Sequence, residues 1–186
     1  MITIMTTGVG AIIGYGILKS LRKSNRDIRL IGADIYPDAI GQAWADHFIV
    51  APLTSSANYL DWLKRNIITH KVDLVIPGIE QDVYFFSKHR KIFDDLSVKV
   101  AINNKSLIEL THDKWLMHQK LLNIDSSARI DSYLDGDFDS LSSKLGLPFI
   151  LKPRCSYASK GLVKVYNKND FMLYADKLGD TLMAQP

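Results

Sequence analysis

The chain has 186 residues, of which 47% are hydrophobic, and its formal net charge is +3 at pH 7. This length suffices for one complete domain and part of a second, and the composition is that of an ordinary globular protein. The single cysteine excludes an internal disulfide, and the five histidines lack the spacing of metal ligands.

The N-terminal segment, residues 1–18, is apolar but has neither the form of a secretion signal nor that of a membrane span. No positive charge precedes it, and four glycines interrupt it. Later apolar runs fall well short of the roughly 20 residues that cross a bilayer. We therefore expect a cytoplasmic protein whose partners are neither membranes nor nucleic acids.

The first hundred residues alternate short apolar runs with amphipathic segments. The apolar runs predict buried strands at 2–5, 28–33, 48–51, 74–76 and 98–102. Helical spacing is seen for Ile13, Ile17 and Leu21, for Leu60, Leu63 and Ile67, and over 81–93. Because crossover helices pack back over a parallel sheet and bury both of its faces, the pattern predicts a Rossmann-like α/β domain.

The turn after the first strand contains Gly8, Gly10 and Gly14. The dinucleotide fingerprint G-x-G-x-x-G needs its third glycine where this chain has Ile13, so the match is imperfect. Asp34 ends the second strand, where a nicotinamide-binding protein would have its ribose-binding acid. The alternative, which we favour, is that the glycines only make a tight turn. Whether Gly8, Gly10 and Asp34 bind any ligand stays open.

Beyond residue 103 the pattern changes to helices separated by short strands. Helices are predicted at 104–110 and 113–122, the second with Asp113 as its N-cap and with Met117 and Leu121 on one face. A strand at 126–134, a helix ending at Leu145, a helix at 169–178 and a strand at 181–184 follow. The chain stops after that strand, which leaves a sheet edge unpaired and indicates a domain cut short.

Residues 148–165 place a cationic loop between two short apolar strands, 149–151 and 162–165. Its basic residues are Lys152, Arg154 and Lys160, and its small residues are Ser156, Ala158, Ser159 and Gly161. Residues 140–169 include six Lys and Arg but no Asp or Glu. Small residues allow backbone N–H groups to face an anion, and Lys152 supplies a point charge at a strand end. The loop is thus a candidate phosphate site; the alternative is a solvated basic hairpin.

Three motifs in the second part of the chain carry a resemblance to a known family. They are H-D-K-W-L-M-H-Q-K-L-L at 112–122, L-P-F-I-L-K-P-R-x-x-x-x-S-K-G at 147–161 and L-M-A-Q-P at 182–186. With the glycine turn before them, they make the whole chain resemble the ATP-grasp superfamily. Residues 31–52 are similar to the carbamoyl-phosphate-synthase-like branch. The resemblance implies a Rossmann-like pre-ATP-grasp domain at 1–110 and the first part of an incomplete ATP-grasp domain at 111–186.

The resemblance also implies which residues bind ATP. Lys114 of the D-K pair and Lys152 would contact the phosphates, and Gln185 would frame the adenine. The loop 154–161 would close over the phosphates as a lid, with ligands at Arg154, Ser156, Ser159, Lys160 and Gly161. The alternatives are that Lys114 is a surface helix lysine and Gln185 merely a chain end. The loop has fewer glycines than is usual in the family, which implies weaker affinity.

A complete member of this family phosphorylates a small-molecule carboxylate with ATP and passes the acyl-phosphate to an amine or another nucleophile. Its Mg²⁺ ligands and the arginine for the reactive carboxylate come after the position where this chain stops. Phosphoryl transfer needs the metal to neutralise developing charge, so we expect no turnover from this chain alone and assign no catalytic residue. A separately encoded C-terminal half is a candidate partner.

Two further interpretations depend on particular residues. Glu80 and Asp82 follow a strand and are either part of the acceptor pocket or acids that favour a helix N-terminus. Cys155 has no flanking histidine and is not expected to be a nucleophile, although neighbouring cations favour its thiolate.

The competing functions for the whole chain are a nicotinamide- or sugar-nucleotide-binding protein, or a non-catalytic nucleotide-binding subunit of a split ATP-grasp enzyme.

Overall fold

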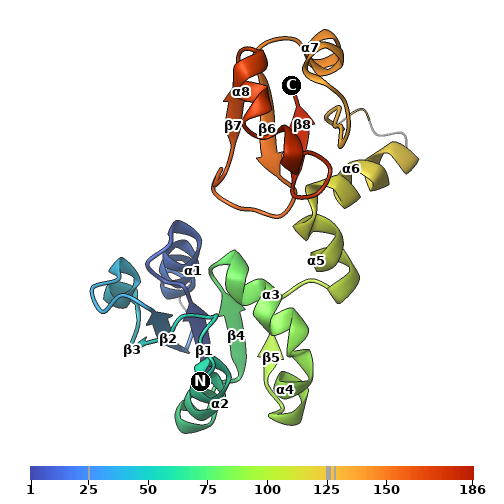
Figure 1. Ribbon diagram of the computed structural model, residues 1–186. Coiled ribbons are helices and arrows are strands. Elements are labelled where there is room, and N and C mark those ends of the chain that lie inside the picture. Colours follow the sequence, from blue (N-terminus) through green and yellow to red (C-terminus); the bar gives the residue numbers. More distant parts are fainter. Residues whose placement is uncertain (25, 125–126, 128) are drawn as a thin grey trace. The chain divides into compact units, whose positions relative to one another are not determined.

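The structure is a computed structural model that describes residues 1–24, 26–124, 127 and 129–186. The chain divides into two compact units, Met1–Lys105 and Ser106–Pro186. Each unit has its own sheet (Figure 1). Each also has its own hydrophobic core. None of the helices built from the described residues is long and apolar enough to cross a membrane.

The first unit is built on a five-stranded parallel sheet in the order β3-β2-β1-β4-β5. Its strands are β1 (Ile2–Thr7), β2 (Ile28–Asp34), β3 (His47–Val50), β4 (Leu74–Pro77) and β5 (Lys99–Val100). Five of the six residues of β1 are buried, as are the last five of β2. Strands covered on both faces are typical of parallel sheets with crossover helices. The predicted α/β class and parallel sheet are confirmed.

Helices cover both faces of this sheet. They are α1 (Ile12–Arg22), the 3₁₀ turn η1 (Ile40–Trp44), α2 (Tyr59–His70), α3 (Glu80–Lys88) and α4 (Arg90–Asp95). Met5 and its neighbours pack with α2 and α3 in one core, whereas Ile4 packs with Leu18 of α1 in another. Successive strand residues point to opposite faces, so these two residues of β1 contribute to different cores.

Two expectations for these helices are wrong in detail. The segment 81–93 forms two helices rather than one, because the backbone of His89 leaves the helical region at φ −108° and ψ 24°. The buried face of α1 contains Gly14 and Leu18, whereas Ile13 is 63% exposed. The apolar stripe predicted through Ile13 therefore lies one position away from the face that packs.

The second unit contains a three-stranded antiparallel sheet in the order β7-β6-β8. The strands are β6 (Phe149–Pro153), β7 (Val163–Val165) and β8 (Leu182–Gln185). The helices are α5 (Lys105–His112), which begins at the unit boundary, α6 (Lys114–Asn123), α7 (Phe138–Leu145), α8 (Lys168–Met172) and the 3₁₀ turn η2 (Ala175–Lys177). Phe149, Leu151 and Val165 form its core with Leu141 of α7 and Phe171 of α8.

Two expectations for this unit also need correction. Positions 126 and 128 of the strand predicted at 126–134 lie outside the described residues, and Tyr133 forms only an isolated bridge with Ala184. The hydroxyl of Ser132 donates to the carbonyl of Ile130, a local side-chain contact that competes with strand pairing. The helix predicted at 169–178 is instead α8 followed by η2.

Candidate phosphate-binding site

Strand β6 brings Lys152 to the surface at the start of the candidate loop. Phe149 and Leu151 are fully buried, and side chains alternate along a strand, so Lys152 lies on the face away from that core. Partial burial lowers the pKa of Lys152 because it desolvates the ammonium, and the nearby charge of Lys114 lowers it further. The fold thus brings together two lysines that are distant in the sequence. An anion between them would relieve their repulsion.

Lys114 begins helix α6, directly after its N-cap residue Asp113. Its ammonium donates to the carbonyl of Ser156 at 2.8 Å and to the carbonyls of Pro153 and Arg154, each at 3.3 Å. The hydroxyl of Ser156 lies 3.4 Å from the same nitrogen. Lys114 is therefore anchored to the loop rather than being a free surface lysine.

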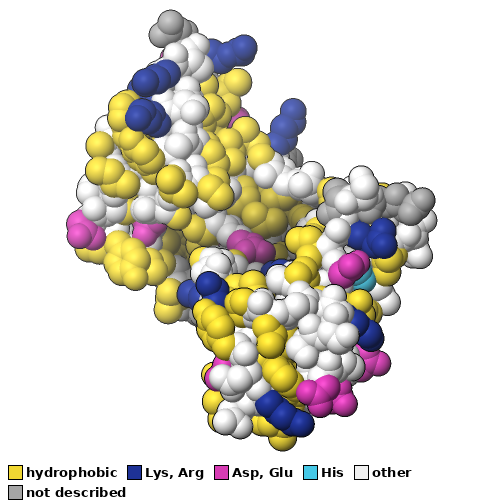
Figure 2. Space-filling model, turned by 90° about the horizontal axis from the view of Figure 1, so that it is seen from above, with side chains coloured by type: hydrophobic (Ala, Val, Ile, Leu, Met, Phe, Trp, Pro, Cys, Tyr) yellow, Lys and Arg dark blue, Asp and Glu magenta, His cyan; other side chains and the backbone are white. Residues whose placement is uncertain are grey.

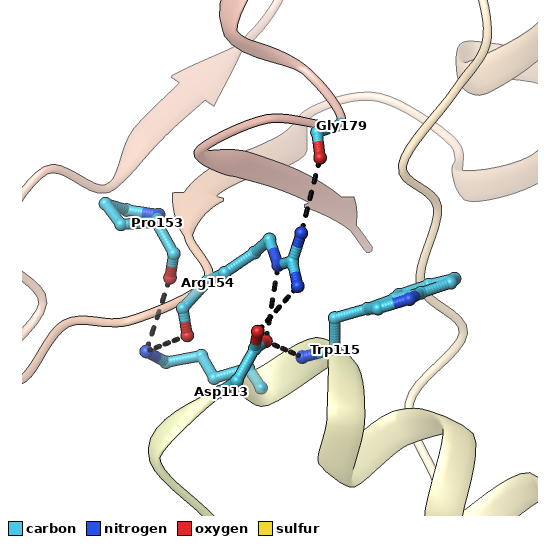
Figure 3. A network of polar contacts seen from close by, with 6 residues as sticks. Asp113, Trp115, Pro153, Arg154 and Gly179 are labelled. Carbon is cyan, nitrogen blue, oxygen red and sulfur yellow. Dashed lines mark hydrogen bonds and ion pairs between the residues drawn. The ribbon is translucent and has the colours of Figure 1, made fainter. Parts of the chain in front are cut away.

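The guanidinium of Arg154 is directed to protein groups. Its Nη2 lies 2.6 Å from Oδ2 of Asp113, Nε donates to Oδ1 at 3.3 Å, and Nη1 donates to the carbonyl of Gly179 at 3.4 Å (Figure 3). Partial burial raises the pKa of Asp113, but the hydrogen bonds from Arg154 and from the Trp115 N–H outweigh it, so the pKa is lowered overall. Asp113 and Arg154 are therefore both charged.

The loop 154–161 has an unusual backbone. Ala158, Ser159 and Gly161 have φ values of 50°, 55° and 77°. The N–H groups of Lys160 and Leu162 donate to the carbonyls of Tyr157 and Ser159, at 3.1 and 3.2 Å, so this left-handed backbone forms two tight turns. Lys160 lies over the ring of Tyr157, 4.7 Å from its centroid. These features suit a phosphate loop, and the predicted binding roles of its side chains stay predictions.

The side chain of Gln185 is engaged within the second unit, and its predicted adenine contact stays a prediction. Its side chain is buried, and its amide donates to the hydroxyl of Ser132 at 2.6 Å. Its backbone pairs with Ile150 of β6. The side chain is thus used to join β8 to the segment before α7. A role for Gln185 in nucleotide binding would have to come from its backbone.

The thiol of Cys155 is exposed and free. Its pKa is raised by partial burial and by Asp113, which together outweigh the lowering by Arg154 and Lys114. The expectation that neighbouring cations favour the thiolate is therefore wrong, because partial burial, together with the charge of Asp113, outweighs their effect on the pKa.

The glycine turn of the first unit is explained by packing. A Cβ atom at Gly14 would lie 2.3 Å from the carbonyl oxygen of Gly8, so α1 can approach β1 only without one. Asp34 is buried, and its carboxylate accepts the N–H groups of Gly10 at 2.6 Å and of Tyr36 at 3.1 Å. The acid that would bind a ribose hydroxyl holds two turns of its own chain instead. This supports the turn interpretation of the glycines.

Glu80 and Asp82 begin α3 at the carboxyl end of β4. Asp82 is 2% exposed and accepts hydrogen bonds from Thr54 at 2.6 Å and Tyr59 at 2.9 Å. Burial raises the pKa of this carboxyl, against the effect of its hydrogen bonds. Glu80 accepts a hydrogen bond from Tyr84. The sequence interpretation missed Thr54 and Tyr59, because nothing in their local pattern indicates a contact with α3.

Hydrophobic side chains are exposed near the carboxyl ends of β1 and β2. The exposed hydrophobic residues that follow these two strands in the sequence are Ile12, Ile13, Ile35, Tyr36 and Ile40. The view from above shows hydrophobic side chains gathered on the surface, with Lys and Arg scattered around them (Figure 2). Strand order reverses between β1 and β4, and open α/β sheets bind ligands outside the strand ends at such a point.

The chain was compared with known proteins. Residues 4–101, slightly more than half of the chain, match the family described as PylC-like, N-terminal domain. The chain belongs to this family. A curated relative, the formate-dependent phosphoribosylglycinamide formyltransferase of Prochlorococcus marinus (strain MIT 9515), is 24% identical over 149 residues, which cover 78% of this chain and 36% of the relative.

Solved structures share the fold of the PylC-like chain. N5-carboxyaminoimidazole synthetase from Staphylococcus aureus, complexed with ADP, superimposes with a TM-score of 0.69 at 20% identity, over 99% of this chain and 47% of that one. N5-carboxyaminoimidazole ribonucleotide synthetase from Thermotoga maritima superimposes with a TM-score of 0.64 at 19% identity. The match covers 100% of this chain and 46% of that one. The PylC-like chain therefore spans less than half the length of these relatives. At 20% and 19% sequence identity, the similarity establishes a shared fold and nothing about activity.

No group of three or more His, Cys, Asp or Glu that could hold a metal ion occurs among residues 1–24, 26–124, 127 and 129–186.

Proposed function

We propose that this PylC-like chain is the ATP-binding portion of an ATP-grasp carboxylate ligase. The proposed domains are a pre-ATP-grasp domain at 1–110 and the first part of an ATP-grasp domain at 111–186. The observation that carries the proposal is the position of Lys114, whose ammonium donates to the carbonyl of Pro153 next to Lys152, at the start of a loop with left-handed backbone at Ala158, Ser159 and Gly161. Two neighbouring cations suit the phosphates of a nucleotide.

The comparisons support this nucleotide class. The Staphylococcus aureus synthetase that shares the fold is complexed with ADP, and the Prochlorococcus relative is formate-dependent, formate being a carboxylate. In the complete protein, ATP would phosphorylate a small-molecule carboxylate, and an amine or another nucleophile would then attack the acyl-phosphate. The narrower placement in the carbamoyl-phosphate-synthase-like branch stays a prediction, as does a cytoplasmic location.

Two partners are part of the proposal. Mg²⁺ would neutralise charge on the phosphates, with its ligands supplied from outside residues 1–186. A separately encoded C-terminal half is one source of those ligands. The acceptor pocket would lie at the carboxyl edge of the first sheet, because strand order reverses there and hydrophobic side chains are exposed.

A nicotinamide-binding function receives less support. The carboxylate of Asp34 accepts backbone N–H groups of Gly10 and Tyr36, and the glycines are needed for packing. A ribose would have to displace those bonds. The alternative of a non-catalytic subunit predicts binding of the same nucleotide. It differs from the ligase proposal only in that a separate partner would supply the catalytic residues.

Calorimetry with ATP, ADP and NAD tests the proposal. The chain should bind ATP or ADP more tightly than NAD, because the charges of Lys114 and Lys152 beside the loop attract the terminal phosphates of these nucleotides. A coupled assay for ADP release with Mg²⁺ and a panel of amino and hydroxy acids should show no turnover by this chain alone. Tighter binding of NAD that is lost in Asp34→Ala would refute the nucleotide assignment.

A further inference from the structure

The ion pair between Asp113 and Arg154 lies at the base of the candidate phosphate loop. Two nitrogens of the guanidinium meet the two carboxylate oxygens, at 2.6 and 3.3 Å, and the side chains are only 14% and 25% exposed. A two-point arginine–carboxylate contact fixes orientation as well as distance. The ATP-grasp resemblance implies that Arg154 binds nucleotide, yet these contacts use its guanidinium inside the second unit.

Backbone hydrogen bonds join the same segments. The N–H of Lys114 donates to the carbonyl of Arg154 at 3.0 Å, and the N–H of Arg154 donates to the carbonyl of Thr181 at 2.9 Å. The guanidinium adds a bond to Gly179 in the turn before β8. Arg154 therefore connects the start of α6, the end of β6 and the approach to β8.

Asp113 connects this pair to Lys114. As N-cap of α6 its carboxylate also accepts the N–H of Trp115 at 2.8 Å, which sets the first turn of the helix. Lys114 is the next residue, and its ammonium reaches the carbonyls of Pro153, Arg154 and Ser156. The position of this ammonium thus depends on where Asp113 and Arg154 hold the helix and the loop.

We propose that Asp113 and Arg154 are positioning residues of the phosphate site. The pair holds the ammonium of Lys114 and the start of the loop 154–161 in the arrangement that receives phosphate, and it does not itself contact the nucleotide. Because its two charges cancel, the attraction for phosphate comes from Lys114 and Lys152. This inference deepens the proposed function and rests on it for its nucleotide part.

Three variants separate geometry from charge. Asp113→Asn keeps an N-cap acceptor for α6 but breaks the ion pair and adds one positive charge. Arg154→Gln breaks the ion pair and removes one positive charge. The double variant Asp113→Asn/Arg154→Gln has no pair and the net charge of the parent. Lys168→Ala is the matched control, since Lys168 forms an exposed ion pair with Asp139 at 3.7 Å in the same unit.

ADP affinity, measured by calorimetry, is the first readout. Each single variant should bind ADP about tenfold more weakly, as expected for loss of a charge-assisted contact, and the double variant should be no weaker than either. Lys168→Ala should bind like the parent. Binding by Asp113→Asn that equals or exceeds the parent would show that Arg154 contacts phosphate directly. Parental affinity in the double variant would show that charge alone matters. Either result would overturn the inference.

Hydrogen exchange without nucleotide is the second readout, and it does not depend on binding. Amides at 154–162 should exchange faster in the pair variants but not in Lys168→Ala, while amides at 149–151 stay protected and show that the unit is folded. Arg154→Lys should behave like Arg154→Gln, because lysine cannot make the two-point contact. Parent-like exchange in all pair variants refutes the positioning role. A parent that binds no ADP refutes the proposed function instead.

Discussion

The phenol of Tyr59 donates a hydrogen bond to the carboxylate of Asp82 across 2.9 Å, and both side chains are buried. Tyr59 opens α2 and Asp82 lies in the first turn of α3, so the bond joins two helices that share one core. Burial raises the pKa of both groups, because each loses solvation in its charged form. The contact is a structural support of the sheet edge where we propose the acceptor pocket.

Tyr59→Phe should destabilise the first unit by about 1–3 kcal/mol, because Asp82 loses a donor in a buried site while the ring packing is kept. The free energy of unfolding can be followed in urea by the fluorescence of Trp44 and Trp62 in a Trp115→Phe background. Tyr36→Phe, at a ring that is 62% exposed, is the control and should change little. Equal effects of the two changes would contradict a role for the bond.

Two glycines of α1 should respond in opposite directions to alanine. A Cβ at Gly14 would lie 2.3 Å from the carbonyl oxygen of Gly8, whereas a Cβ at Gly16 has no heavy atom within 4 Å. We expect Gly14→Ala to destabilise the first unit by roughly 1–3 kcal/mol through overpacking. Gly16→Ala should stabilise it by roughly 0.5–1 kcal/mol through helix propensity. The same fluorescence assay measures both, and a stable Gly14→Ala would disprove the close approach.

His70 should make the stability of the first unit depend on pH. Its ring lies 4.7 Å from that of His47, and burial, then His47 and Arg29, lower its pKa from 6.5. The unfolded chain therefore takes up a proton at higher pH than the folded one. Stability should fall as pH drops through about 6.5. His70→Gln should reduce this slope. A slope unchanged by His70→Gln would exclude the effect.

Lys152→Ala should weaken ATP binding by about tenfold or more, since a half-buried ammonium beside Lys114 is lost. Lys160→Ala should weaken ATP binding less than Lys152→Ala, because Lys160 is exposed and lies over the ring of Tyr157. Amides at 154–161 should also exchange more slowly once nucleotide is added. Titration calorimetry and hydrogen exchange check both statements. If Lys152→Ala binds ATP like the parent, the loop is a solvated basic hairpin.

Much of the fold was predictable because its signals are local. Apolar runs such as 28–33 indicate buried strands, and the amphipathic segment with Leu63 and Ile67 indicates a covering helix, which together imply a parallel sheet. Asp113 was predicted as an N-cap and accepts the N–H of Trp115. Such features depend on neighbours within a few residues, so the sequence alone specifies them.

The tertiary structure decided which distant residues meet. Nothing local to Arg154 indicates that its guanidinium pairs with Asp113, and nothing local to Gln185 indicates that its amide is used by Ser132. The same holds for Asp34, whose carboxylate accepts the N–H of Gly10. A side chain's charge and length are written in the sequence, but its partner depends on which surfaces the packed strands and helices bring together.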